Sequence, residues 1–141
     1  MRILVATDGS ENSLNAVKYA AKLTANLGSS GQITLVSVHD DTALRHASQL
    51  VGRAEVDDYL RDLSEKELQP ALQALAGTNV AHDHAIVVGH VSEEIVKLAD
   101  SGKYDMIVMG SKGRSGIADL LIGSVAQRVL ATARQPVLLV K

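Results

Sequence analysis

The sequence predicts an α/β fold, a five-stranded parallel sheet in the order 3-2-1-4-5 with helices on both faces (Rossmann-like). Apolar runs of strand length alternate with helical patterns from end to end, as expected of repeated strand–helix–strand units. The two most distinctive loops, 8–10 and 110–124, follow the first and the fourth strand. The order 3-2-1-4-5, unlike the other common order 2-1-3-4-5, brings these two loops together where the winding reverses.

The first half of the chain supplies two strands and one clear helix. Arg2–Thr7 and Ile33–Val38 are apolar runs, as expected of strands buried on both faces. Between them, Asn12–Leu27 has apolar side chains at helical spacing, and Gly28 follows where a glycine commonly ends a helix. Asp40–Gly52 is polar and predicts an irregular segment with room for one short helical turn.

The second half begins with a long helix. We expect this helix over Ala54–Ala76, with a kink at Pro70 because proline removes a backbone donor. Val80–Val88 is the third predicted strand. A short helix over Ser92–Asp100 follows, and Ser92 is a suitable N-cap for it.

The last part of the chain contains two further strands and one helix. Tyr104–Met109 is the fourth predicted strand, Gly110–Ile122 a loop, Ser124–Thr132 the last helix and Pro136–Val140 the fifth strand. The sequence has no internal repeat, linker or low-complexity segment. Its 141 residues therefore predict one domain over 1–141.

Composition limits the classes of partner. The net charge is −2, with 14 Lys and Arg against 16 Asp and Glu and no basic block, so we expect no nucleic acid partner. Aromatic residues are 2% of the chain, too few for base-stacking platforms. No apolar run approaches the roughly 20 residues that span a bilayer, so we expect no membrane partner. The absence of cysteine excludes disulfides and suits a cytoplasmic protein.

Glycines are concentrated after the fourth strand, with the spacing Gly110-x2-Gly113-x9-Gly123-Ser124. Glycine lets a backbone approach a ligand closely or adopt positive φ, and consecutive free N–H groups in such turns bind anions. Gly123 and Ser124 fall at the start of the last helix, whose unpaired N–H groups and positive dipole end attract phosphate. The segment therefore predicts a phosphate site.

Three polar side chains can contribute to this site. Ser124 can add a hydroxyl donor, and Lys112 and Arg114 can add positive charge. The plain alternative is that the glycines only shape a loop. Their number, and their place beyond the carboxyl end of a strand, favour phosphate binding. The segment is not a Walker-type P-loop, and the loop 8–10 lacks the dinucleotide motif G-x-G-x-x-G.

The sequence resembles the ATP-binding branch of the universal stress protein family over essentially the whole chain. The resemblance rests on the glycine spacing and on four segments, 3–10, 35–38, 105–111 and 134–140. One departure is Ala6, where many members have proline. The resemblance implies an ATP-binding regulatory module of the stress response that acts as a dimer.

The resemblance also implies a set of ligand-binding residues. Thr7, Asp8 and Val38 would border the adenine and ribose, Asp8 through its carboxylate and Val38 through its backbone, with Ala6 beside them. The ribose and phosphates would be lined by Met109, Gly110, Gly113, Gly123, Ser124 and Val125. Mg²⁺ would accompany ATP, held chiefly by phosphate oxygens and water. Asp8 has an alternative role as an Asx-type cap of the turn into the first helix, and both roles can coexist.

Three functions are compatible with the sequence. The first is a binding module in which an adenine nucleotide sets the conformation or partner surface. The second is an enzyme, a slow ATPase or a phosphoryl or nucleotidyl transferase, because a helix start with Lys112 and Arg114 can stabilise phosphoryl transfer. No water-positioning base is evident for such a reaction. The third is a nucleotide-free interaction protein, against which the complete glycine spacing argues.

The predicted sheet order leaves the last strand, Pro136–Val140, at an edge. Such an apolar edge needs cover, and pairing with its own copy across a two-fold axis provides it. The family usually forms dimers of this kind. We therefore expect a homodimer through the last strand.

Several other polar residues are interpreted as structural. His82 and His84 share one face of the third strand and could hold a metal ion, but we expect them to be polar residues that protect an edge strand. His39 follows the second strand near the proposed site and could reach phosphates or a cation, but we expect it in a solvated loop. The charged residues 65–67 are expected on the solvated face of the long helix.

Overall fold

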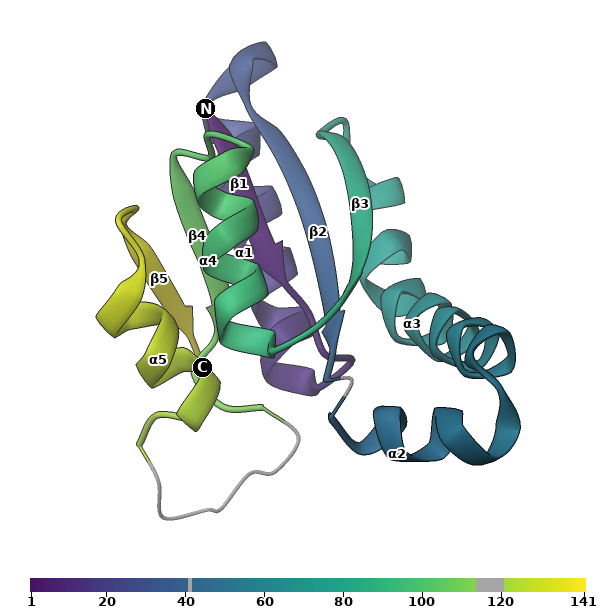
Figure 1. Ribbon diagram of the computed structural model, residues 1–141. Coiled ribbons are helices and arrows are strands. Elements are labelled where there is room, and N and C mark those ends of the chain that lie inside the picture. Colours follow the sequence, from purple (N-terminus) through teal and green to yellow (C-terminus); the bar gives the residue numbers. More distant parts are fainter. Residues whose placement is uncertain (41, 114–120) are drawn as a thin grey trace.

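The computed structural model describes residues 1–40, 42–113 and 121–141. Strands and helices alternate along this part of the chain (Figure 1). The strands are β1 (Arg2–Ala6), β2 (Gln32–His39), β3 (Ala81–Val88), β4 (Met106–Gly110) and β5 (Val137–Val140). The helices are α1 (Glu11–Asn26), α2 (Thr42–Val51), α3 (Arg53–Ala76), α4 (Val91–Ser101) and α5 (Ser124–Thr132), with a short 3₁₀ turn at Gly28–Ser30.

All five strands run parallel in one sheet of order β3-β2-β1-β4-β5, which confirms the predicted fold. β1 lies in the middle, where Val5 is opposite Leu35 of β2 and Val108 of β4. Because β1 and β4 are neighbours, the loops that follow them leave the same edge of the sheet side by side. This topology brings together the two loops that the sequence singled out.

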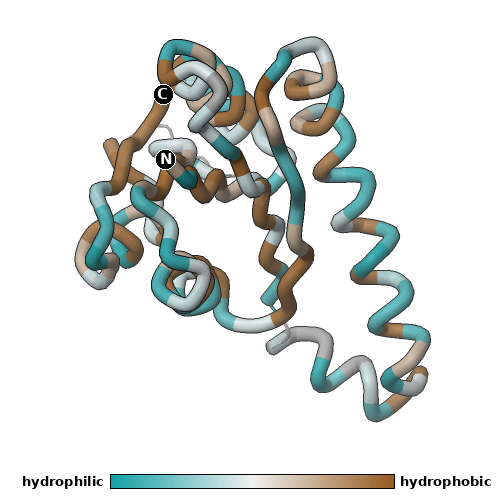
Figure 2. The backbone as a smooth tube through the Cα atoms, turned by 90° about the horizontal axis from the view of Figure 1, so that it is seen from above, coloured by the Kyte–Doolittle hydropathy of each residue, from teal (hydrophilic) through white to brown (hydrophobic). Residues whose placement is uncertain are grey.

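Helices cover both faces of the sheet, α1 and α3 on one side and α4 and α5 on the other (Figure 1). Successive side chains of a strand point to opposite faces. Ile3 and Val5 therefore pack with α1 and α3, whereas Leu4 and Ala6 pack with α4 and α5. Figure 2 shows the apolar strands enclosed between the helices. Burial on both faces explains why β1 is a continuous apolar run.

The segment after β2 differs from its prediction. Thr42–Val51 forms the regular helix α2, and Gly52, with φ of +97°, turns the chain directly into α3. The Asp40 carboxylate accepts hydrogen bonds from the Thr42 hydroxyl at 2.5 Å and from its backbone N–H at 2.8 Å. These bonds lower the pKa of Asp40. Since the folded-state pKa is lowered, this contact is kept at neutral pH and is lost only as acid protonates the carboxyl.

The start of α4 also differs from its prediction. The helix begins at Val91, and His90 is its N-cap residue, with its carbonyl accepting a hydrogen bond from the Glu94 N–H at 2.9 Å. Ser92 is therefore buried in the first turn, and the prediction that it caps this helix is wrong. The long helix α3 continues through Pro70. Among the described helices, none is long and apolar enough to cross a membrane.

Candidate functional site

A hollow opens beyond the carboxyl ends of β1, β2 and β4, where the winding of the sheet reverses. This is the position at which open α/β sheets usually bind ligands. The structure brings eleven of the twelve sequence-predicted site residues to its lining: Ala6, Thr7, Asp8, Val38, Met109, Gly110, Lys112, Gly113, Gly123, Ser124 and Val125. The twelfth, Arg114, lies outside the described residues.

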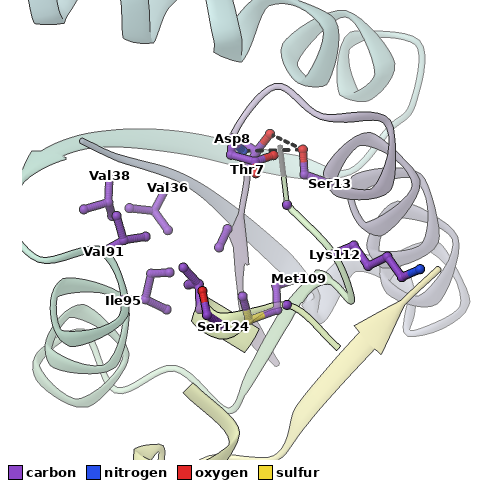
Figure 3. A pocket seen from close by; sticks show the side chains of 15 residues that line it. Thr7, Asp8, Ser13, Val36, Val38, Val91, Ile95, Met109, Lys112 and Ser124 are labelled. Carbon is purple, nitrogen blue, oxygen red and sulfur yellow. Dashed lines mark hydrogen bonds between the residues drawn. The ribbon is translucent and has the colours of Figure 1, made fainter. Parts of the chain in front are cut away.

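One wall of the hollow is apolar. Val36 and Val38 come from β2, Val91 and Ile95 from α4, and Met109 from β4 (Figure 3). Val36, Val91 and Ile95 were not predicted as site residues, because nothing local in the sequence indicates that α4 faces the ends of β2 and β4. Such a wall buries the face of a ring or another flat apolar group.

The opposite side of the hollow carries hydroxyl and carboxylate oxygens (Figure 3). The Asp8 carboxylate accepts a hydrogen bond from the Ser10 N–H at 2.9 Å, which is the predicted Asx-type turn. Ser10 in turn caps α1, because its side chain accepts from the Ser13 N–H at 3.2 Å. Ser13 is buried, lines the hollow and lies 3.1 Å from Thr7, Oγ to Oγ1. Ser13 was likewise not predicted as a site residue from the sequence.

The N-terminus of α5 forms the third side. Gly123 is the N-cap residue, and no side chain in the described part of the chain caps the helix. The amide of Gly123 donates to the Ser111 carbonyl at 2.7 Å, so this N–H group is already used within the protein. The N–H groups of the first turn, beginning with Ser124 and Val125, have no partner within the helix. Together with the dipole, they make this end of the hollow suited to an anion.

Close packing explains two glycines of this segment, Gly110 and Gly113. Positive φ values among the described glycines occur at positions 9, 28, 52 and 89, and not at Gly110, Gly113 or Gly123. A Cβ atom on Gly110 would lie 2.9 Å from the backbone carbon of Asn12, and one on Gly113 would lie 3.0 Å from Asp8 Oδ2. Glycine at position 110 therefore lets the end of β4 approach the first turn of α1, and glycine at position 113 lets the following loop approach Asp8.

Lys112 contributes differently from the prediction. It lines the hollow, but Figure 3 shows its side chain pointing away from Asp8 and from the apolar wall. Among the described residues, the positive end of the hollow therefore consists of the backbone N–H groups at the start of α5 rather than of the Lys112 ammonium group.

Comparison with known proteins agrees with this arrangement. The model of the Universal stress protein family matches residues 1–141. The chain belongs to the universal stress protein family. A universal stress protein of Thermus aquaticus is 34% identical to it, over 99% of this chain and 97% of that protein. Universal stress protein MJ0577 of Methanocaldococcus jannaschii is 30% identical, over 99% and 94%.

Solved universal stress protein structures share the fold. The structure of MJ0577 superimposes with a TM-score of 0.87 at 28% identity, covering 99% of this chain and 94% of that one. A universal stress protein crystallised in complex with cAMP gives a TM-score of 0.72 at 27% identity, covering 100% and 97%.

This universal stress protein has a buried contact that the sequence analysis did not predict. His39 Nε2 lies 3.4 Å from Glu67 Oε2 and 3.3 Å from Ser37 Oγ. The His39 and Glu67 side chains are only 12% and 8% exposed, so the prediction that both are solvated is wrong. The contact joins α3 to the end of β2, on the face of the sheet opposite Val38.

A protein-built metal site is not evident in the described part of this universal stress protein. Residues 1–40, 42–113 and 121–141 contain no group of three or more His, Asp or Glu side chains placed to hold a metal ion. His82 and His84 are exposed on the edge strand β3. The His82 ring instead contacts the Val80 carbonyl, Nδ1 to O, at 2.8 Å.

Proposed function

We propose that this universal stress protein binds ATP in the hollow beyond β1 and β4 and acts as a nucleotide-dependent regulatory module of the stress response. The observation that carries the proposal is the N-terminus of α5, which no side chain among residues 1–40, 42–113 and 121–141 caps and which opens on the hollow at Ser124 and Val125. The first N–H groups of a helix have no acceptor within the helix. An anionic group placed there would accept hydrogen bonds from them.

The three sides of the hollow match the three parts of a nucleotide. The apolar wall around Val38 and Met109 fits the face of a base. The oxygens of Thr7 and Asp8 fit sugar hydroxyls, which are hydrogen-bond donors. The start of α5 fits phosphate. A related universal stress protein was crystallised in complex with cAMP, which supports an adenine nucleotide as the ligand class.

Mg²⁺ is proposed to arrive with the nucleotide. Phosphate oxygens and water supply most Mg²⁺ ligands in nucleotide sites, so the metal does not require a cluster of protein carboxylates. Asp8 is the carboxylate that lines the hollow, and its position beside Gly113 suits contact with the sugar or with water around the metal ion.

A calorimetric titration with ATP, ADP and AMP, each with and without Mg²⁺, tests the proposal. We expect saturable binding of ATP near one molecule per chain. ATP at 100 times its Kd is expected to raise the free energy of unfolding by about 2.7 kcal/mol, because it binds only the folded state. This gain is measured by thermal unfolding with and without ligand. Absence of both heat and thermal shift with every adenine nucleotide would contradict the proposal, and steady release of ADP or AMP would favour the enzyme alternative.

We further propose that the protein forms a homodimer through β5, an edge strand of the sheet. The carbonyls of Pro136 and Val140 accept hydrogen bonds from the N–H groups of Ile107 in β4 and of Ser111 directly after it. Backbone groups alternate in direction along a strand, so the N–H and carbonyl of Leu139 point away from β4. Pairing with a second copy would satisfy them.

The variant Leu139→Pro is expected to convert the dimer to a monomer. Proline removes the outward N–H of Leu139 without removing a hydrogen bond to β4, and edge positions tolerate proline. Leu139→Ala is the matched control, because it shortens the same side chain and keeps the N–H. Sedimentation velocity at micromolar concentration measures the result. A wild-type monomer, or a Leu139→Pro dimer as tight as the alanine variant, would contradict this interface.

A further inference from the structure

Four hydrogen bonds meet near the Ser13 hydroxyl, on the oxygen-rich side of the hollow. Ser13 Oγ donates to the Ser10 carbonyl at 2.9 Å. It also lies 3.1 Å from Thr7 Oγ1 and accepts a long hydrogen bond from the Asp8 N–H at 3.4 Å. The Gly9 N–H makes a further long contact to Thr7 Oγ1 at 3.5 Å. Figure 3 shows Thr7, Asp8 and Ser13 side by side at this end of the hollow.

The direction of these bonds follows from the number of protons. A hydroxyl has one proton to donate and two lone pairs that accept. Since Ser13 gives its proton to the Ser10 carbonyl, the proton between Ser13 and Thr7 must come from Thr7. Thr7 thus uses its only donor toward the protein interior, and its remaining capacity toward the hollow is as an acceptor.

Thr7 and Asp8 then present acceptors alone to a ligand. The Asp8 carboxylate accepts but does not donate, and its Oδ1 is held by the Ser10 N–H. A ligand group facing these two residues gains most if it brings hydrogen-bond donors, as ribose hydroxyls do. A sugar that lacks its hydroxyls would donate no hydrogen bonds to the Thr7 and Asp8 oxygens and would therefore bind less tightly.

We propose that Ser13 is a positioning residue that makes this end of the hollow an acceptor surface, so that the site selects nucleotides carrying ribose hydroxyls over their deoxy forms. This inference rests on the proposed nucleotide binding and deepens it. Ser13 is 4% exposed and acts through Thr7 and Asp8.

Removal of the hydroxyl should spare the local fold. The cap of α1 uses the backbone N–H of Ser13, which donates to Ser10 Oγ, and alanine keeps this N–H. Alanine is also the most favourable residue inside a helix. In Ser13→Ala, the Thr7 hydroxyl loses its acceptor and becomes free to turn its proton toward the ligand, and the Asp8 N–H loses its contact.

The test is calorimetric titration of the wild type and Ser13→Ala with ATP and with 2′,3′-dideoxy-ATP, both in Mg²⁺. We expect the wild type to prefer ATP by about tenfold or more, as one or two hydrogen bonds to fixed acceptors can provide. Ser13→Ala should lose about tenfold of its affinity for ATP and change little for the dideoxy nucleotide. The ratio of the two affinities is the readout that general loosening of the site would not move.

Ser92→Ala is the matched control, because Ser92 is also buried in the first turn of a helix beside the hollow and contacts neither Thr7 nor Asp8. We expect this variant to keep the wild-type ratio. If Ser13→Ala kept the wild-type ratio of the two affinities, whether or not both affinities fell, the role of Ser13 would be overturned while nucleotide binding stayed in place. If the wild type bound neither nucleotide, the proposed function itself would be contradicted, and the inference with it.

Discussion

Replacement of Ser124 by proline is expected to lower the affinity for ATP by about 10- to 100-fold and to leave the nucleotide-free protein as stable as the wild type. The expected loss corresponds to one hydrogen bond from a backbone N–H to a charged phosphate, about 1.5–3 kcal/mol. Ser124 is the first residue of α5, where proline is well accepted because its missing N–H has no partner in the helix.

The local backbone is compatible with this substitution. A residue before proline must be extended, and Gly123 already has φ of −68° and ψ of 157°. Ser124→Ala is the matched control, because it removes the hydroxyl and keeps the N–H. Calorimetry with ATP gives the affinities, and thermal unfolding without ligand gives the stability. Equal affinities of the proline and alanine variants would mean that this amide does not contact phosphate.

The second large effect is expected at Gly110. In Gly110→Ala, the new Cβ would lie 2.9–3.0 Å from backbone and Cβ atoms of Asn12 and from the backbone nitrogen of Ser13. Because those atoms belong to the first turn of α1, the helix must shift away from β4. Overpacking of this kind costs about 1–3 kcal/mol of the free energy of unfolding. The shift also moves Ser13 and the Asp8 turn, so ATP affinity should fall as well.

Gly77 offers a matched control for Gly110. It also lacks positive φ, and a Cβ added there meets no atom within 4 Å. Gly77→Ala is therefore expected to be neutral or to stabilise by up to about 1 kcal/mol, since alanine lowers the entropy of the unfolded chain. Urea unfolding of both variants measures the difference. If Gly110→Ala unfolded at the same urea concentration as Gly77→Ala, the close contact between β4 and α1 would not limit stability.

The fold could be predicted because each strand signal is local. Burial on both faces makes β1, β2 and β4 largely apolar, and the two unusual loops indicated which strands are neighbours. The helix α2 could have been found too, because apolar residues recur at positions 43, 44, 47, 50 and 51, a helical spacing. The polar residues between these positions made the segment look irregular in the sequence.

The parts of the site that were missed depend on tertiary contacts. In the sequence, Ser13 looks like an ordinary residue at a helix start. Its importance comes from the contact of its hydroxyl with Thr7, which only the fold shows. Glu67 reads as a solvated charge in a polar helix, and only the fold places it against His39. The close approach of Gly110 to α1 likewise requires β1 and β4 to be neighbours.

The connection from α5 to β5 has a thermodynamic consequence. The chain leaves α5 at Thr132 and enters the edge strand at Val137, so one continuous segment carries both the proposed anion contacts and the proposed subunit interface. Under these two proposals, a ligand that changes the position of α5 changes the strength of self-association. Linkage makes this coupling reciprocal, so the apparent nucleotide affinity would then depend on the protein concentration.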